Sequence, residues 1–99
     1  SRRDLYSQFP QLCGKRILLF LGRITAKKRP EIIVRALAKL RMTSPDSVLV
    51  IAGNDAGHLP ATRDEVQRHG LDEAVIFTGF LSGKLKQAAL SVADIFVLP

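Results

Sequence analysis

The sequence predicts an α/β domain of the Rossmann-like, three-layer type: a four-stranded parallel sheet in the order 3-2-1-4, with helices on both faces. Four short runs, at about residues 17–21, 48–52, 75–78 and 95–98, are almost wholly apolar. Strands buried on both faces of a parallel sheet have this composition. Helical patterns separate the runs, as right-handed βαβ crossovers require. The predicted order follows from a doubly wound arrangement, in which the first and fourth strands flank the switch point.

The 99 residues are enough for one domain, and 46% of them are hydrophobic, which suffices for a core. No apolar run approaches the roughly 20 residues of a transmembrane helix, and Ser1–Asp4 leads into no signal-peptide core. Cys13 is the single cysteine, so an internal disulfide is excluded. We expect a cytoplasmic protein, or one bound peripherally at the inner face of a membrane.

The net charge of +6 is unevenly distributed. Residues 1–41 carry eleven lysines and arginines against two acids, whereas the remaining residues carry four against seven. This asymmetry favours a polyanionic or membrane-surface partner for the first part of the chain.

Residues 1–16 contain a candidate short helix and are interpreted as a lead-in to the domain proper, residues 17–99. The first helix of the domain is predicted at about 30–41, because Pro30 suits a first helical turn. One face of this helix is apolar, at spacings of four and three: Ile33, Leu37 and Leu40. Another face carries charges four residues apart that are expected to pair: Glu31, Arg35 and Lys39.

The second helix is expected to begin near Thr62, because residues 62–65 have the form of a capping box, and to end at Gly70. Ser82 is predicted to cap the third helix. The inward face of that helix is expected to consist of Leu85, Ala88, Ala89 and Val92.

Glycine follows three of the predicted strands, at what would be one edge of the sheet: Gly22, Gly53 and Gly79. Ligands of open α/β sheets bind at that edge. After Gly22, four of the next seven residues are cationic, and a helix N-terminus follows. These features predict an anion site, with Arg23 at the edge of the sheet and Lys28 returning toward it. The alternative is a solvated cationic loop.

Two nucleotide-binding motifs are excluded. Residues 79–85 have three residues between the glycines of a P-loop instead of four, and Leu85 stands where Ser or Thr would hold magnesium. No Gly-x-Gly-x-x-Gly occurs. The two histidines, His58 and His69, are interpreted as surface residues, and Asp55 as a sugar-hydroxyl partner or a turn residue.

The ordered set of motifs resembles the C-terminal, donor-binding half of the GT-B-fold glycosyltransferases of family 4 (glycosyl transferases group 1). The matching segments are Leu21-Gly22-Arg23 with Lys28, residues 50–53, Gly70-Leu71, residues 75–81 and residues 93–99. The resemblance implies that this chain forms half of the C-terminal domain of a GT-B protein. It also implies a retaining glycosyltransferase that uses a UDP-, GDP- or ADP-sugar donor, an unknown sugar or lipid-linked acceptor, and no metal or other cofactor.

The resemblance also implies roles for single residues. Arg23 and Lys28 match the arginine and lysine that hold the donor diphosphate, beside Gly22. Gly53 matches the loop bordering the donor. Gly79 and Phe80 match the turn whose backbone faces the base.

Two departures from the family pattern matter. Arg29 stands where many members have glycine after the lysine, and the glutamate pair of the family would lie beyond the proline matched by Pro99. We therefore expect a truncated domain with no catalytic residue of its own, inactive alone and prone to self-association through an exposed edge strand.

Two other interpretations remain open. The basic first part favours a nucleic-acid-binding α/β module without catalytic activity, although three of the five phenylalanines lie in buried runs and offer no stacking platform. The other interpretation is a regulatory or scaffolding α/β domain without a ligand.

Overall fold

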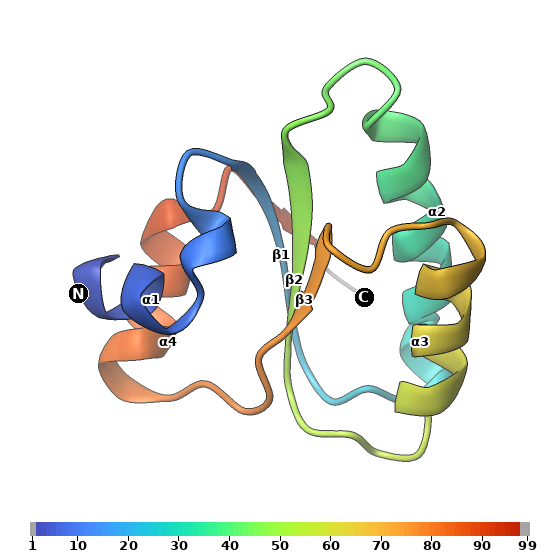
Figure 1. The fold of residues 1–99 in the computed structure, drawn as a ribbon. Coiled ribbons are helices and arrows are strands. Elements are labelled where there is room, and N and C mark those ends of the chain that lie inside the picture. Colours follow the sequence, from blue (N-terminus) through green and yellow to red (C-terminus); the bar gives the residue numbers. More distant parts are fainter. Residues whose placement is uncertain (1, 98–99) are drawn as a thin grey trace.

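The computed structural model describes residues 2–97. They form a four-stranded parallel sheet between two layers of helices (Figure 1). In chain order the elements, η denoting a 3-10 helix, are α1 (Arg2–Gln8), η1 (Pro10–Leu12), β1 (Arg16–Leu21), η2 (Ala26–Lys28), α2 (Pro30–Leu40), β2 (Ser47–Ala52), α3 (Leu59–Arg68), β3 (Val75–Phe77), α4 (Gly83–Val92) and β4 (Ile95–Val97).

The strand order is β3-β2-β1-β4 and every pairing is parallel, which confirms the predicted topology. Val75, Leu49, Leu18 and Ile95 lie side by side across the four strands. The predicted fourth strand extended one residue further, to Leu98, which lies outside the described residues.

Successive residues of the strands point to opposite faces of the sheet, and both faces are covered. Leu19 points to the face covered by α1 and α4, and Phe20 points to the face covered by α2 and α3 (Figure 1). Both side chains are fully buried. Burial of such a side chain stabilises a fold by about 1.5–3 kcal/mol, which explains why the strands consist of apolar residues without alternation.

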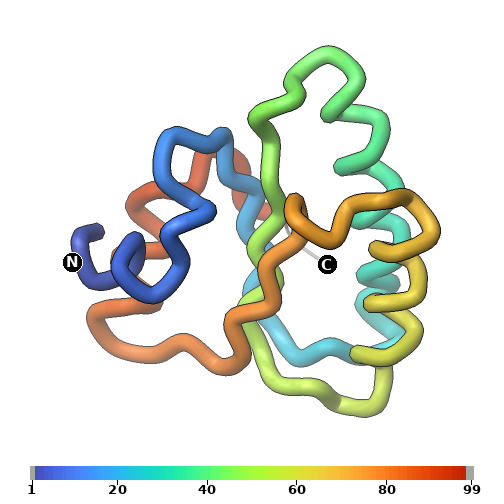
Figure 2. Tube along the Cα trace, viewed as in Figure 1, coloured from blue at the N-terminus to red at the C-terminus, as the bar shows by residue number. Residues whose placement is uncertain are grey.

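The N-terminal segment packs against α4 and the sheet (Figure 2). Leu5 of α1 and Leu12 of η1 are each only 1% exposed, within the same apolar cluster as Leu19. The segment interpreted from the sequence as a lead-in therefore contributes two fully buried side chains to one layer of the core.

Helix α2 begins at the predicted residue, but Arg35 and Glu31 make their side-chain hydrogen bonds outside the helix. The Nε of Arg35 donates to Glu65 of α3 at 2.6 Å, and Glu31 lies 2.7 Å from the ring of His58. Part of the predicted pairing along the helix is present, since Arg35 and Glu31 attract each other electrostatically. Their hydrogen bonds go to other elements, because α3 packs beside α2 and brings a buried carboxylate to Arg35.

Helix α3 begins at Leu59 rather than at Thr62, so the predicted capping box is wrong. Thr62 is buried inside the helix, where its hydroxyl donates to the carbonyl oxygen of His58 at 2.8 Å. The helix start is instead held by Asp55, whose carboxylate accepts the backbone N–H groups of Gly57 and Leu59. Turn chemistry therefore accounts for Asp55.

The predicted ends of the later helices agree better with the structure. Gly70 adopts a φ of 65° after α3, and Leu71 donates back to the carbonyl oxygen of Val66 at 3.0 Å, as a glycine stop requires. Ser82 occupies the N-cap position of α4, but its hydroxyl makes no capping hydrogen bond.

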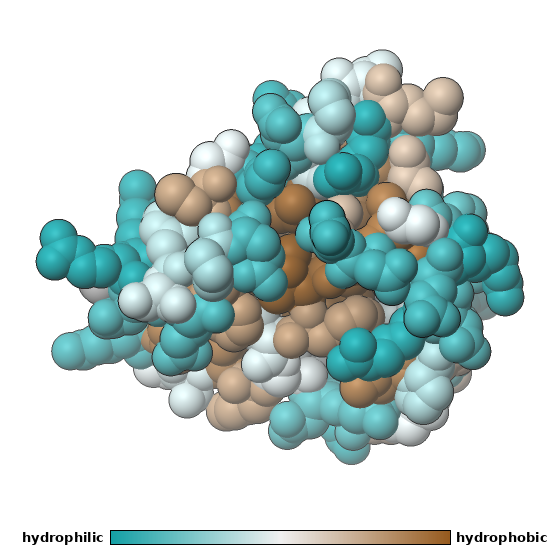
Figure 3. Space-filling model, viewed as in Figure 1, coloured by the Kyte–Doolittle hydropathy of each residue, from teal (hydrophilic) through white to brown (hydrophobic). Residues whose placement is uncertain are grey.

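Apolar residues are visible in the middle of one face of the molecule, over the strands, whereas hydrophilic residues lie over the helices (Figure 3). Within residues 2–97, no helix has the length and apolar character needed to cross a bilayer.

Candidate functional site

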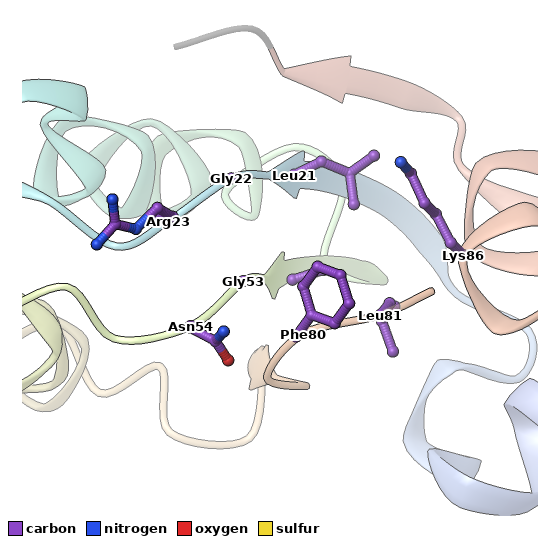
Figure 4. A pocket seen from close by; sticks show the side chains of 9 residues that line it. Leu21, Gly22, Arg23, Gly53, Asn54, Phe80, Leu81 and Lys86 are labelled. Atoms are coloured by element: carbon purple, nitrogen blue, oxygen red, sulfur yellow. The ribbon is translucent and has the colours of Figure 1, made fainter. Parts of the chain in front are cut away.

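A pocket of about 410 Å³ lies at the carboxyl ends of β1 and β2, beside the segment that follows β3 (Figure 4). It lies at the edge of the sheet where the sequence predicted a ligand. The residues that line it are Leu21, Gly22, Arg23, Ala52, Gly53, Asn54, Phe80, Leu81 and Lys86.

Gly22 and Gly53 form the centre of the pocket wall. Here the segments that follow β1 and β2 leave the sheet almost in contact. The N–H of Gly22 donates to the carbonyl oxygen of Ala52 at 3.0 Å. Two residues further on, Ile24 donates to the carbonyl oxygen of Asn54 at 2.9 Å. The pairing of β1 with β2 thus continues past both glycines and holds Arg23 and Asn54 on neighbouring segments.

Lys28 returns to the end of β1, as the sequence predicted. It closes the short helix η2, and its Nζ would lie 3.2 Å from a Cβ built on Gly22. Lys28 does not line the 410 Å³ pocket itself, but its ammonium lies over a residue that does. Arg23 follows Gly22 directly, so both predicted cations lie close to Gly22, and of the two only Arg23 lines the pocket.

The residue after Lys28 has an unusual backbone conformation. Arg29 adopts φ 49° and ψ 56°, the left-handed region that non-glycine residues rarely occupy. At this position the sequence departs from the family that it resembles, in which many members have glycine after the lysine. The loop therefore adopts a conformation suited to glycine, although an arginine occupies the position.

Phe80 forms the apolar part of the pocket. The residue is 68% exposed, and its ring lies beside Leu81 in Figure 4. Gly79, with a φ of 73°, turns the chain just before it and does not itself line the pocket. An exposed aromatic ring next to Leu21 and Leu81 offers a flat apolar wall on which another ring can stack.

Two polar residues of the pocket were not predicted. Lys86 extends from α4 toward Leu21, and Asn54 lies beside Gly53 (Figure 4). The sequence did contain a signal for Lys86, namely a lysine a few residues after Gly79, the glycine that follows the third strand. Lys84 and Lys86 both meet this description, however, and only the rotation of α4 distinguishes them.

The cations around the pocket have no acidic partner in the part of the chain that the structure describes. Within residues 2–97, no acidic side chain forms an ion pair with Arg23, Lys28 or Lys86. Because a cleft lined by one sign of charge concentrates ions of the opposite sign, this arrangement favours an anionic ligand with an apolar ring at its other end.

Comparison with protein families and curated proteins gives consistent matches. The family model of the glycosyl transferases group 1 matches residues 3–99. Alpha-D-kanosaminyltransferase of Streptomyces kanamyceticus is 35% identical over 83 residues, which are 84% of this chain and 21% of that protein. The GDP-mannose-dependent alpha-(1-6)-phosphatidylinositol monomannoside mannosyltransferase of Mycolicibacterium smegmatis is 29% identical over 83 residues, 84% of this chain and 22% of that protein. The chain thus spans about a fifth of the length of these relatives.

Solved structures share the fold. HepE of Anabaena in complex with UDP superimposes with a TM-score of 0.77 at 20% identity, over 97% of this chain and 27% of HepE. The C-terminal domain of LpcC, a glycosyl transferase group 1 family protein of Francisella tularensis, superimposes with a TM-score of 0.71 at 24% identity, over 97% of this chain and 51% of that domain.

Proposed function

This chain belongs to the glycosyl transferases group 1 family, and on that premise we propose that it binds the diphosphate and base of a nucleotide-sugar donor. The whole protein would transfer the sugar to an acceptor with retention of the anomeric configuration. The relatives support a nucleotide donor, since HepE was solved with UDP and the mannosyltransferase depends on GDP-mannose.

One observation carries this proposal: cations that have no acidic partner within residues 2–97 and a flat apolar wall lie together at the carboxyl edge of the sheet. Arg23 lines the pocket and Lys28 lies over Gly22, so these two side chains would hold the diphosphate. Phe80 and Leu81 supply the apolar wall for the base. Each charge-assisted hydrogen bond to a phosphate contributes about 1.5–3 kcal/mol.

The same two cations would also help to catalyse the transfer of the sugar. When the glycosidic bond of the donor breaks, negative charge builds up on the departing diphosphate. Arg23 and Lys28 would stabilise that charge more strongly in the transition state than in the bound donor, and this difference accelerates the reaction. Lys86, at the far side of the pocket near Leu21, would supply a further hydrogen-bond donor for the nucleotide.

Beyond this charge stabilisation, no acid, base or nucleophile is proposed in this chain, and the chain alone is expected to bind a nucleotide without turning over a donor. The expected affinity for UDP or GDP is weak, with a Kd in the millimolar range.

Calorimetric titration with UDP, UMP and uridine tests the proposal. Arg23→Ala and Lys28→Ala should each weaken UDP binding by roughly tenfold or more and should affect uridine much less. If both variants bind UDP as the wild type does, the diphosphate assignment is wrong.

A nucleic-acid-binding module is the second candidate, because the basic residues of the first part of the chain are also largely exposed. The aromatic residues do not favour it. Within residues 2–97, the most exposed aromatic residues are Phe80, in the segment between β3 and α4, and Phe96, in β4, whereas Phe20 is fully buried.

A further inference from the structure

His58 contacts the chain on both sides of the turn that carries Lys28. Its backbone N–H donates to the carbonyl oxygen of Ile24 at 3.3 Å, just before the turn. Its ring Nε2 lies 2.7 Å from the carboxylate of Glu31, just after the turn. A single residue of the loop after β2 therefore holds both ends of residues 25–30.

The turn itself has few bonds of its own. Lys28 and Arg29 donate their backbone N–H groups to residues three positions earlier, at 3.3 and 3.1 Å. Arg29 is in the left-handed region, which costs free energy for a residue with a Cβ. A short turn with a strained residue needs support from outside to keep one conformation.

The contact between His58 and Glu31 is well suited to give that support. The two side chains are 21% and 27% exposed, so water screens the pair only partly. An ionised carboxylate can only accept, so the ring carries a hydrogen on Nε2 and donates it. Burial alone would raise the pKa of Glu31, but its own backbone N–H and the His58 ring outweigh burial and lower this pKa, which keeps the carboxylate ionised.

We propose that His58 is a positioning residue: its pair with Glu31 clamps the turn at residues 25–30 and so keeps Lys28 over Gly22, where the donor diphosphate would bind. The inference rests on the proposed function. It gives His58 a part in binding, although this residue does not line the pocket and was interpreted from the sequence as a surface histidine.

The decisive experiment is a double-variant cycle with UDP as the probe, measured by calorimetry on the 99-residue chain. His58→Ala should weaken UDP binding by about 3- to 10-fold, less than complete loss of the lysine contact. His58→Gln, whose amide can still donate to Glu31, should bind UDP more tightly than His58→Ala. In a Lys28→Ala background, His58→Ala should cause no further loss, because it acts through Lys28.

The matched control is His69→Ala. His69 also contacts a carboxylate, Glu65, at 2.9 Å, but it follows the C-terminal end of α3 and does not line the pocket. This variant should shift the unfolding midpoint and leave UDP affinity unchanged. If His58→Ala weakens UDP binding equally with and without Lys28, or leaves it unchanged, the clamp is wrong.

A readout without a ligand separates the clamp from the proposed function. If the wild type fails to bind UDP and GDP, the proposed function fails. The clamp then still predicts that His58→Ala removes the nuclear Overhauser contacts between the Lys28 side chain and Gly22, while His69→Ala retains them. Retention of these contacts in His58→Ala would overturn the clamp whether or not UDP binds.

Discussion

A Cβ atom on Gly53 would lie 1.7 Å from the carbonyl oxygen of Gly22 and 2.5 Å from its carbonyl carbon. Both of these atoms belong to the backbone, so no rotation of a side chain can make room. The segments that follow β1 and β2 approach each other this closely because two hydrogen bonds flank Gly53. Gly22 donates to Ala52 and Ile24 donates to Asn54. Gly53 is therefore required by the packing of the pocket wall, whatever the ligand.

Gly53→Ala should accordingly destabilise the protein by more than the usual ~1–3 kcal/mol of an overpacked core, and it should abolish UDP binding. Chemical denaturation measures the first effect. Gly70→Ala is the control: Gly70 has a φ of 65° and open space around it, so this variant should cost only the ~1–2 kcal/mol of left-handed strain. Equal losses in the two variants would contradict the close approach.

Arg29→Gly should stabilise the protein by roughly 0.5–1 kcal/mol. Glycine removes the left-handed strain of about 1–2 kcal/mol, and the greater freedom of glycine in the unfolded chain offsets part of that gain. Arg29→Ala, which keeps a Cβ, should leave the free energy of unfolding nearly unchanged. If the alanine variant gained as much as the glycine variant, charge rather than backbone conformation would be responsible.

Acid should destabilise the protein partly through Glu65. The hydrogen bond from Arg35 lowers the pKa of this carboxyl below its ordinary value of 4.5, burial opposes the shift, and His69 and Arg68 reinforce it. A carboxyl whose pKa is lower in the folded state stabilises the fold above its unfolded pKa, and this stabilisation is lost as the pH falls through the folded value.

Denaturation at a series of pH values tests this directly. Glu65→Gln should be less stable than the wild type near neutral pH and should lose less stability on acidification below about pH 5. Some acid sensitivity should remain, because the pKa values of Glu31 and Asp55 are lowered too. A stability difference between Glu65→Gln and wild type that does not change with pH would exclude the assigned role of Glu65.

The edge strand β4 predicts self-association. Ile95 and Phe96 are 44% and 48% exposed, and β4 pairs with β1 on one side only. Exposed edge strands with apolar side chains tend to associate. Sedimentation of the 99-residue chain should therefore show mass increasing with concentration, and Phe96→Lys should reduce the increase. A stable monomer at high concentration would refute this prediction.

The fold was predictable from the sequence because its main determinants are local. The apolar runs around Phe20 and Leu49 needed burial on both sides, and together with the helical patterns between the runs this requirement selects a parallel sheet covered by two helix layers. Arg23 and Lys28 were predictable too, because a few residues around Gly22 determine where both lie.

The rest depended on contacts between elements distant in sequence. The start of α3 could not be predicted because Asp55, not Thr62, holds its first N–H groups. The sequence placed the partner of Arg35 within α2. Its hydrogen bond to Glu65 could not be predicted, because the packing of α3 on α2 sets the position of Glu65. Lys86 reaches the pocket through the rotation of α4, which no single stretch of sequence determines.

The central claim, that Arg23 and Lys28 hold a nucleotide diphosphate, is tested most directly by NMR titration of the isotope-labelled chain. UDP, GDP and a short oligonucleotide are added separately to the wild type, Arg23→Ala and Lys28→Ala. The account predicts that both nucleotides shift the amide resonances of Gly22, Arg23 and Lys28, and that each variant weakens the response. It is contradicted if the nucleotides shift nothing near these residues while the oligonucleotide shifts basic residues throughout 1–41.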